Sequence, residues 1–345
     1  MDRDELVANA RVVALPMRER FRGITVREAL LIDGGDGRWA EWSPFTEYDD
    51  AEASTWLRAA LAELTPSRPQ SERSASRSLS ERSETKGPPP AIRVNATVPA
   101  IPAAAVPALL DRFPGVRTAK VKVAERGQSL ADDLARVAAV RAALGPAGRI
   151  RVDANALWSL DEAETALRAL ADFDLEYAEQ PVASIQDMVA LRSRLHPLVR
   201  IAADELVRKP EDPLAVARAG AADLLILKLQ PLGGAARALD ILAEAGLPAV
   251  TSSALETSVG LAAAARFAAM VNARQPDVDF DHGLGTAALF AADVTADPLL
   301  PVDGAIPLRE VRPDAELLDR YAAAPERRDW WLARLRRCIT LLDAG

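Results

Sequence analysis

Residues 118–123 read TAKVKV, and residues 149–154 read RIRVDA. Each stretch is a short apolar strand pattern that carries charged side chains near its C-terminal end. Between them, residues 129–144 read SLADDLARVAAVRAAL, which is an amphipathic helix pattern. A strand, a helix and a second strand in this order predict a βαβ unit with two parallel strands. This unit indicates the fold class, because the alternation continues along the chain.

Further strand and helix patterns alternate from about residue 92 onward. The strand patterns occupy residues 93–98, 175–180, 199–204, 223–229, 248–253 and 278–283. Helix patterns separate several of them, at residues 160–173, 233–246 and 258–271. Eight strands with crossover helices predict an α/β fold that closes into a TIM-like barrel. An open, doubly wound sheet is the alternative, but no GxGxxG turn follows a strand to support a dinucleotide site.

The N-terminal part, residues 1–90, has a different pattern. Residues 30–44 read as two strands around a Gly-rich turn, and residues 49–64 form an amphipathic helix pattern. Residues 66–90 are rich in Ser, Arg, Glu and Pro and are expected to form a flexible loop or linker. The N-terminal part is therefore predicted to be an α+β domain.

The barrel is expected to span residues 91–297. The C-terminal segment, residues 298–345, is rich in proline at first and then reads as a helix at 329–342. We expect this segment to pack back against the N-terminal part.

Composition narrows the class of protein. The 345 residues are 49% hydrophobic and 27% charged, with no apolar stretch of the length that a membrane span requires. The net charge of −8 argues against a nucleic-acid surface as the main function. The N-terminus lacks the pattern of a secretory signal, and Cys338 is the only cysteine, so a cytoplasmic protein is expected. The sequence leaves the oligomeric state open, with a monomer as one option.

Charged side chains stand at or near the C-terminal ends of five successive predicted strands, and a sixth ends in a polar run. In a barrel these ends converge on one mouth, so residues about 25 positions apart can line one pocket. The charged residues are Lys120, Lys122, Asp153, Glu179, Asp204 and Lys228, and the polar run is Thr251, Ser252 and Ser253.

The three carboxylates Asp153, Glu179 and Asp204 indicate a divalent metal. Left unpaired on adjacent strands they would repel one another, and a hard cation with oxygen ligands resolves this. Mg²⁺ is the expected ion and Mn²⁺ would also suit, whereas zinc normally recruits His or Cys, and the only histidines are His196 and His282. The structural alternative is that each acid pairs with a neighbouring lysine or caps the following helix.

Lys122 and Lys228 indicate proton transfer. A lysine near a metal and other lysines has a lowered pKa, which makes it a usable general base at neutral pH. The two lysines lie on strands that flank the carboxylate strands, so they can approach a bound substrate from opposite faces. The metal can neutralise the enediolate formed when a proton leaves the carbon alpha to a carboxylate. The predicted substrate is thus a small carboxylate; an exposed alternating strand is the structural alternative for Lys120 and Lys122.

This set of residues resembles the enolase superfamily, in its muconate-lactonizing branch. The resemblance covers nearly the whole chain and includes Lys120-Val121-Lys122, Asp153-Ala154-Asn155, Glu179-Gln180-Pro181, Asp204-Glu205 and Lys228-Leu229-Gln230. Within that branch, further segments look most like the o-succinylbenzoate synthase family of menaquinone biosynthesis. These segments are Phe21-Arg22-Gly23-Ile24-Thr25, Val94-Asn95-Ala96-Thr97-Val98, Arg151-Val152-Asp153-Ala154-Asn155 and Ser252-Ser253-Ala254-Leu255-Glu256-Thr257-Ser258.

The resemblance implies a (β/α)7β barrel closed by an α+β capping domain that combines the N-terminal part and the C-terminal segment. It also implies that Asp153, Glu179 and Asp204 hold Mg²⁺. Lys122 would abstract the proton and return it to the departing hydroxyl in a syn elimination, and Lys228 would stabilise the delocalised intermediate.

The resemblance implies supporting roles for residues around these groups. Lys120 would assist electrostatically, and Arg151 and Asn155 would support the metal and the substrate. The succinyl carboxylate would be received by Thr251, Ser252 and Gly283, with Ser253 beside them. The loop around Arg20 and Arg22 would close the pocket.

One element departs from the synthase pattern. Asp279-Phe280-Asp281 is similar to the D-x-D with which dipeptide epimerases of this branch hold a substrate ammonium. An N-succinylamino acid racemase or a dipeptide epimerase therefore stays open as an alternative, since both would use the same lysine pair. The alternative from another class is a catalytically silent barrel that acts as a binding protein.

Overall fold

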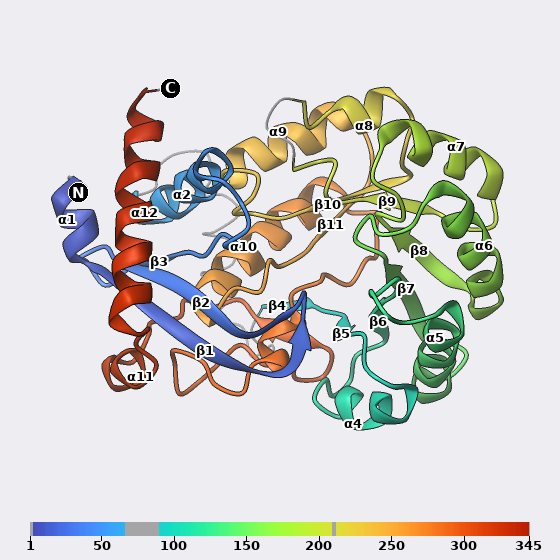
Figure 1. Cartoon of the computed structure of the whole chain (residues 1–345), viewed down its shortest axis with the longest axis horizontal. Helices are drawn as coiled ribbons and strands as arrows, with labels where there is room; N and C mark the ends of the chain where they lie inside the picture. The colour runs from blue at the N-terminus through green and yellow to red at the C-terminus, as the bar shows by residue number, and fades with distance from the viewer. Residues whose placement is uncertain (1–2, 66–89, 209–211, 345) are drawn as a thin grey trace.

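The computed structural model describes residues 3–65, 90–208 and 212–344. A smaller antiparallel sheet with helices stands beside a larger body of parallel strands and outer helices (Figure 1). The predicted linker at residues 66–90 lies, apart from Pro90, outside the described residues. Over the described ranges, no helix has the length and apolar character needed to cross a membrane.

The smaller sheet comes from the N-terminal part of the chain. Its elements are α1 (Arg3–Ala8), β1 (Ala10–Phe21), β2 (Ile24–Asp33), β3 (Trp39–Trp42) and α2 (Asp50–Leu64). β2 pairs antiparallel with both β1 and β3. The Asp49 side chain accepts a hydrogen bond from the backbone N–H of Glu52 and so fixes the start of α2. The predicted strands around a Gly-rich turn and the predicted helix at 49–64 are confirmed.

The C-terminal helices lie against this sheet. They are α11 (Ala315–Arg320) and α12 (Pro325–Ala344), and α12 contains the helix predicted at 329–342. The buried Trp331 ring of α12 meets the Trp42 ring of β3 edge to face at 5.4 Å. Arg334 donates hydrogen bonds to backbone carbonyls of the loop before α2. The last helix is thus held by apolar and polar contacts with the N-terminal elements.

The larger body is built on a curled sheet of seven parallel strands in sequence order. They are β5 (Ala96–Val98), β6 (Thr118–Lys122), β7 (Arg149–Asp153), β8 (Leu175–Glu179), β9 (Ile201–Ala203), β10 (Leu224–Leu227) and β11 (Ala249–Thr251). The predicted α/β alternation is confirmed for these strands.

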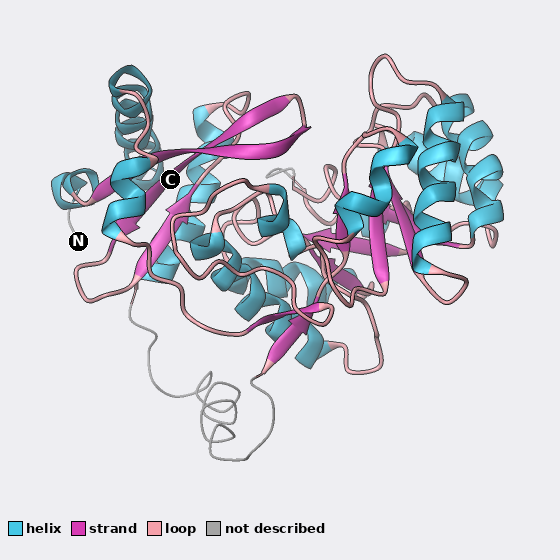
Figure 2. Ribbon diagram, turned by 90° about the horizontal axis from the view of Figure 1, so that it is seen from below, coloured by secondary structure: helices cyan, strands magenta, loops and turns pink. Residues whose placement is uncertain are grey.

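Helices cover the outside of this sheet (Figure 2). They are η2 (Ala103–Ala105), α4 (Val106–Leu110), α5 (Leu130–Leu144), α6 (Leu160–Leu170), η3 (Ala171–Phe173), α7 (Ile185–Leu195), α8 (Ala215–Arg218), α9 (Ala235–Ala245) and α10 (Ser258–Arg274). Ser129 and Ser159 begin α5 and α6 with capping boxes, in which the serine and an acid three residues later satisfy each other's backbone N–H groups. The apolar faces of these helices, such as Leu167 and Leu170 of α6, are buried in the core.

The predicted strand pattern at 93–98 is divided in the structure. β4 (Ala91–Arg93) pairs antiparallel with β12 (Ala305–Pro307), and only β5 joins the parallel sheet.

The predicted eighth strand, residues 278–283, is wrong as a regular strand. Only two isolated bridges form there, His282 with Val94 and Gly283 with Ser252. These two residues contact both edges of the seven-stranded sheet, because the chain crosses between the edges and then turns into η4 (Gly285–Leu289). The segment therefore joins the first and last strands without running along either of them.

The strand register brings the charged residues to one level. Lys122 pairs with Asp153, and Asp153 pairs with Glu179, across β6, β7 and β8. Each is the last residue of its strand. Asp204 and Lys228 directly follow β9 and β10. The prediction that these residues close successive strands at one end of the sheet is confirmed.

Candidate active site

Lys120 lies buried between two carboxylates. Its Nζ is 2.9 Å from Glu179 Oε1 and 3.3 Å from Asp153 Oδ2. Burial lowers the pKa of this lysine, but the charges of Glu179 and Asp153 outweigh burial and raise it above its usual range. Lys120 is therefore a fixed positive charge rather than a proton acceptor.

Lys122 lies two residues after Lys120 on β6, at the mouth. Its Nζ donates to Asp153 Oδ2 at 2.6 Å and also contacts Asn155 Oδ1, while the ammonium lies 5.3 Å from the centre of the Phe21 ring. Burial lowers the pKa of Lys122; Asp153 opposes this shift and the charge of Lys120 adds to it. The direction of the shift suits a general base.

Lys228 approaches from the other side of the carboxylates and contacts Asp204. Asp204 also faces Arg208, whose Nε is 3.1 Å from Asp204 Oδ1. Burial raises the pKa of Asp204, but Arg208 and Lys228 outweigh it and lower the pKa to about 2. Asp204 is thus ionised at neutral pH.

The three carboxylates differ in their readiness to ionise. For Asp153, burial is outweighed by Lys122 and Lys120, and the pKa falls below its usual range. For Glu179, burial and then the charge of Asp153 raise the pKa to about 7. Glu179 thus lies in the field of other carboxylates, which disfavours its ionised form.

The side-chain chemistry of Asp153, Glu179 and Asp204 fits a divalent cation. All three side chains offer carboxylate oxygens, and the buried Oδ1 of Asp204 accepts no hydrogen bond. As the side chains stand, however, no three His, Cys, Asp or Glu residues in the described ranges are grouped to hold a metal ion. Lysine ammonium groups contact the carboxylates instead. The metal assignment to Asp153, Glu179 and Asp204 therefore stays a prediction.

The mouth encloses a small cavity of about 30 Å³. This is room for about one water molecule, so a larger ligand must displace side chains. The cavity is lined by Phe21, Arg22, Phe45, Thr97, Lys120, Lys122, Asp153, Asn155, Lys228, Ser252, Ser253, Ala254, Leu255, Gly283 and Thr286. Phe21, Arg22 and Phe45 come from the N-terminal part, so the β1–β2 turn and the loop after β3 reach the mouth.

Five of the predicted substrate-binding residues line this cavity, namely Arg22, Asn155, Ser252, Ser253 and Gly283. Three others do not. Arg20 is exposed on the hairpin, Thr251 is buried with an unpartnered Oγ1, and Arg151 lies inside the sheet. Their predicted contacts with a substrate stay predictions.

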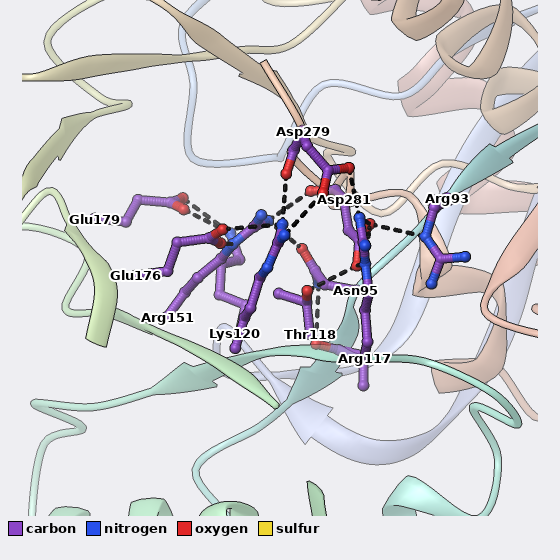
Figure 3. A network of polar contacts seen from close by, with 12 residues as sticks. Arg93, Asn95, Arg117, Thr118, Lys120, Arg151, Glu176, Glu179, Asp279 and Asp281 are labelled. Atoms are coloured by element: carbon purple, nitrogen blue, oxygen red, sulfur yellow. Dashed lines mark hydrogen bonds and ion pairs between the residues drawn. The ribbon is translucent and has the colours of Figure 1, made fainter. Parts of the chain in front are cut away.

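Arg151 belongs to a polar network in the interior of the curled sheet, in which Lys120 and Glu179 also lie (Figure 3). Its Nε donates to Glu176 at 2.5 Å, and its Nη1 donates to Asn95 Oδ1 at 3.0 Å and to the Asp281 carbonyl at 2.6 Å. The guanidinium also stacks on the Tyr177 ring, 4.8 Å from its centre. As it stands, Arg151 on β7 contacts β8, the residue before β5 and the crossing segment.

The two aspartates of the D-x-D element contact arginines in the same network (Figure 3). Asp281 is fully buried and accepts hydrogen bonds from Thr118 Oγ1 at 2.7 Å, from Arg117 Nη2 at 2.9 Å and from Arg93 Nε at 3.2 Å. Asp279 accepts from Arg117 and Arg149. Arg117 and Arg149 stand at the N-terminal end of the sheet, away from the lysine mouth. Neither aspartate lines the mouth cavity.

Several lining residues were not predicted from the sequence. Thr97 lies in a segment that the family resemblance had already marked, whereas Thr286 does not, and Thr286 shares a hydrogen bond of 2.7 Å with Ser253. Phe45 carries no signal of its own, because its place follows from how the N-terminal part meets the sheet. Gln180, next to Glu179, accepts a hydrogen bond from the Asp204 backbone N–H at 3.0 Å and so positions the next carboxylate.

Comparisons with known proteins agree with this arrangement. The family described as "Enolase C-terminal domain-like" matches residues 105–313, and "Enolase N-terminal domain-like" matches residues 12–63. The o-succinylbenzoate synthase of Mycobacterium ulcerans (strain Agy99) is 49% identical over 344 residues, which cover 98% of this chain and 95% of that protein. The o-succinylbenzoate synthase of Mycolicibacterium smegmatis is 49% identical over 340 residues, with 98% of each chain covered.

Solved structures agree on the fold. Muconate lactonizing enzyme from Pseudomonas fluorescens superimposes with a TM-score of 0.71 at 22% identity, over 91% of this chain and 98% of that chain. The 2-chloromuconate cycloisomerase from Rhodococcus opacus 1CP gives a TM-score of 0.71 at 24% identity, over 92% and 98%. The two matching family domains and the 49% identity to o-succinylbenzoate synthases over nearly the whole chain, together with the mouth of lysines and carboxylates, establish that the chain belongs to the enolase superfamily and, within it, to the o-succinylbenzoate synthase family.

Proposed function

We propose that this protein is an o-succinylbenzoate synthase. It would dehydrate 2-succinyl-6-hydroxy-2,4-cyclohexadiene-1-carboxylate to o-succinylbenzoate in menaquinone biosynthesis. The observation that carries the proposal is the meeting of Lys122, Lys228 and three carboxylates at one mouth. It occurs in a chain that is 49% identical to named synthases over nearly its full length.

Lys122 is the proposed base and acid. Its neutral amine takes the proton from the carbon alpha to the ring carboxylate, and the C–H electron pair moves into the ring. The resulting ammonium then gives the same proton to the hydroxyl on the neighbouring carbon. The C–O bond breaks, water leaves and the ring becomes aromatic, so no oxidant or reductant is needed. One residue on one face serves both steps, which is the requirement of a syn elimination.

The other two lysines act by charge. Lys228, which contacts Asp204 on the far side of the carboxylates, would stabilise the delocalised anion. Lys120, buried with a raised pKa, stays protonated and lowers the pKa of its neighbour Lys122. Asn155 contacts the Lys122 ammonium and would orient it toward the substrate.

Asp153, Glu179 and Asp204 are proposed to hold Mg²⁺, or Mn²⁺, once the lysine side chains turn from them toward the substrate. A bound divalent cation would neutralise the negative charge that develops on the substrate carboxylate. Asp204 Oδ1, which accepts no hydrogen bond, and the raised pKa of Glu179 support this donor set.

We also propose how the barrel closes and where the domains begin and end. The two bridges of His282 and Gly283 support a (β/α)7β barrel in which the crossing segment completes the ring. A division into a capping domain of residues 1–90, a barrel of residues 91–297 and a C-terminal segment of residues 298–345 is supported by the contacts of α12 with the N-terminal sheet. A cytoplasmic location stays a prediction.

The experiment is a product assay. The purified chain with Mg²⁺ and the cyclohexadiene precursor should give an aromatic product that is followed by ultraviolet absorbance. A chelator should abolish the change, and Lys122→Ala should slow it by about 10²- to 10⁴-fold. Racemisation of N-succinylamino acids is measured in parallel. Racemisation without any aromatic product would overturn the synthase proposal in favour of the racemase.

A further inference from the structure

The segment between β11 and α10, residues 252–257, forms one wall of the mouth cavity, and we call it the pocket loop. Ser252, Ser253, Ala254 and Leu255 of this loop all line the cavity. Leu255 has a φ of +62°, a left-handed conformation that a leucine rarely adopts. Such a conformation persists only where the surroundings hold it.

Arg27 of β2 contacts the pocket loop from the N-terminal sheet. This arginine is 2% exposed, and its Nε donates to the Leu255 carbonyl at 3.0 Å. Its Nη2 donates to the Ala254 carbonyl at 3.2 Å and also contacts the Ser43 carbonyl. The guanidinium lies 4.4 Å from the centre of the Phe45 ring, which lines the same cavity. Arg27 therefore fixes both carbonyls around the left-handed residue.

Glu41 of β3 holds the other end of the loop. Its buried carboxylate accepts hydrogen bonds from Thr257 Oγ1 at 2.6 Å, from the Thr257 N–H at 3.0 Å and from the Gly260 N–H at 3.1 Å. These donors lie at the N-terminal end of α10, where Thr257 is the N-cap. A carboxylate is favoured there by the free N–H groups and the helix dipole. A Cβ on Gly260 would lie 2.8 Å from Glu41 Oε2, so the close approach requires a glycine there.

We propose that Arg27 and Glu41 are positioning residues that set the substrate specificity of the pocket. The two side chains fix the pocket loop in the shape that receives the substrate carboxylate distant from Lys122, a role that rests on the proposed function. Neither residue lines the cavity, so each acts through the loop. Docking of the N-terminal sheet and substrate recognition would thus depend on the same contacts.

The simpler alternative is that these residues only hold the two parts of the chain together. Glu28, the neighbour of Arg27 on β2, provides a matched control. Its carboxylate accepts from Arg327 at 2.8 Å and from Trp331 Nε1 at 2.9 Å, both on α12. Glu28→Ala thus removes a similar set of hydrogen bonds from the same sheet without touching the pocket loop.

The test compares Glu41→Ala, Arg27→Lys and Glu28→Ala with the unaltered protein in the dehydration assay. Glu41→Ala and Arg27→Lys should raise KM by about tenfold or more and change kcat by less than about threefold, since the lost contacts serve binding rather than the chemical step. Glu28→Ala should leave KM unchanged. Glu41→Gln, which keeps an acceptor oxygen, should recover part of the loss.

Hydrogen exchange of residues 252–257, measured by mass spectrometry, provides a readout that needs no substrate. Exchange should be faster in Glu41→Ala than in Glu28→Ala. Equal KM values, or equal exchange in the two variants, would overturn the inference. If Glu41→Ala does not fold, Arg27→Lys decides by the same criteria. An unaltered protein that forms no aromatic product would instead refute the proposed function, while hydrogen exchange would still test the positioning of the loop.

Discussion

Replacing Asp281 by asparagine should destabilise the fold far more than the same change at Asp279. Asp281 is fully buried and accepts from Thr118, Arg117 and Arg93. Removing one partner of a buried ion pair costs about 3–5 kcal/mol. The Arg117 and Arg93 side chains are 36% and 45% exposed and can regain water. The cost for Asp281→Asn should therefore lie near the lower end, at about 3 kcal/mol.

The Asp279 side chain is 65% exposed, although it contacts Arg117 and Arg149. Exposed ion pairs contribute about 1 kcal/mol or less, so Asp279→Asn should cost no more than that. Urea denaturation at pH 7 measures both free energies of unfolding. An equal loss of unfolding free energy in the two variants, or no loss in Asp281→Asn, would refute the structural role of Asp281. If the pair instead held a substrate ammonium, both changes would weaken binding of a dipeptide and leave stability nearly unchanged.

Three further predictions concern Lys122 and Asp204 at the mouth and the buried Glu41 of β3. Lys122→Ala should lower kcat by about 10²- to 10⁴-fold in the absorbance assay, and Lys122→Arg should not restore it, because a guanidinium does not give up its proton; near-normal activity of the arginine variant would contradict the base assignment. Mg²⁺ alone should raise the melting temperature of the unaltered protein but not of Asp204→Asn, and equal shifts in the two proteins would exclude Asp204 as a ligand. The pKa of Glu41 is raised from 4.5 to about 7, mainly by burial and then by the charge of Glu256. The folded protein thus holds this proton more tightly than the unfolded chain, and stability should fall by about 3 kcal/mol as the pH rises from 4.5 to 7. Glu41→Gln should flatten this part of the curve of unfolding free energy against pH, and parallel curves for the two proteins would contradict the pKa.

The positions of the charged residues could be predicted from the sequence because they follow from local pattern and chain direction. Apolar strands that alternate with amphipathic helices make a parallel sheet, and parallel strands end at the same edge. Lys122, Asp153 and Glu179 each end a strand, so the register alone brings them to one level. No long-range contact has to be known for this inference.

The direction of individual side chains could not be predicted in the same way. Asp279 and Asp281 resemble a substrate-binding element in sequence, but their partners are arginines more than 100 residues away in the chain. The contacts of Arg27 with the pocket loop depend on how the N-terminal sheet meets the larger body. A strand pattern at 278–283 likewise could not show that the segment crosses between two sheet edges and pairs with each at a single residue.

The charges at the mouth explain why metal and substrate should bind together. Three lysines face three carboxylates, and the nearby Arg208 and Glu205 add one charge of each sign. The buried cluster is therefore close to neutral when all these groups are ionised. A divalent cation alone would leave two uncompensated positive charges in a site where burial makes unbalanced charge costly.

A ligand with two carboxylates would balance the remaining positive charge. We therefore expect Mg²⁺ to bind about tenfold or more tightly in the presence of o-succinylbenzoate than in its absence, and the ligand to gain the same factor from Mg²⁺, because coupling between two sites is reciprocal. Calorimetric titrations of each component with and without the other measure both factors. A monocarboxylate such as benzoate should produce a smaller gain, since it leaves one positive charge uncompensated. Equal gains for benzoate and o-succinylbenzoate would show that metal coordination, and not the charge balance of the buried site, couples the two.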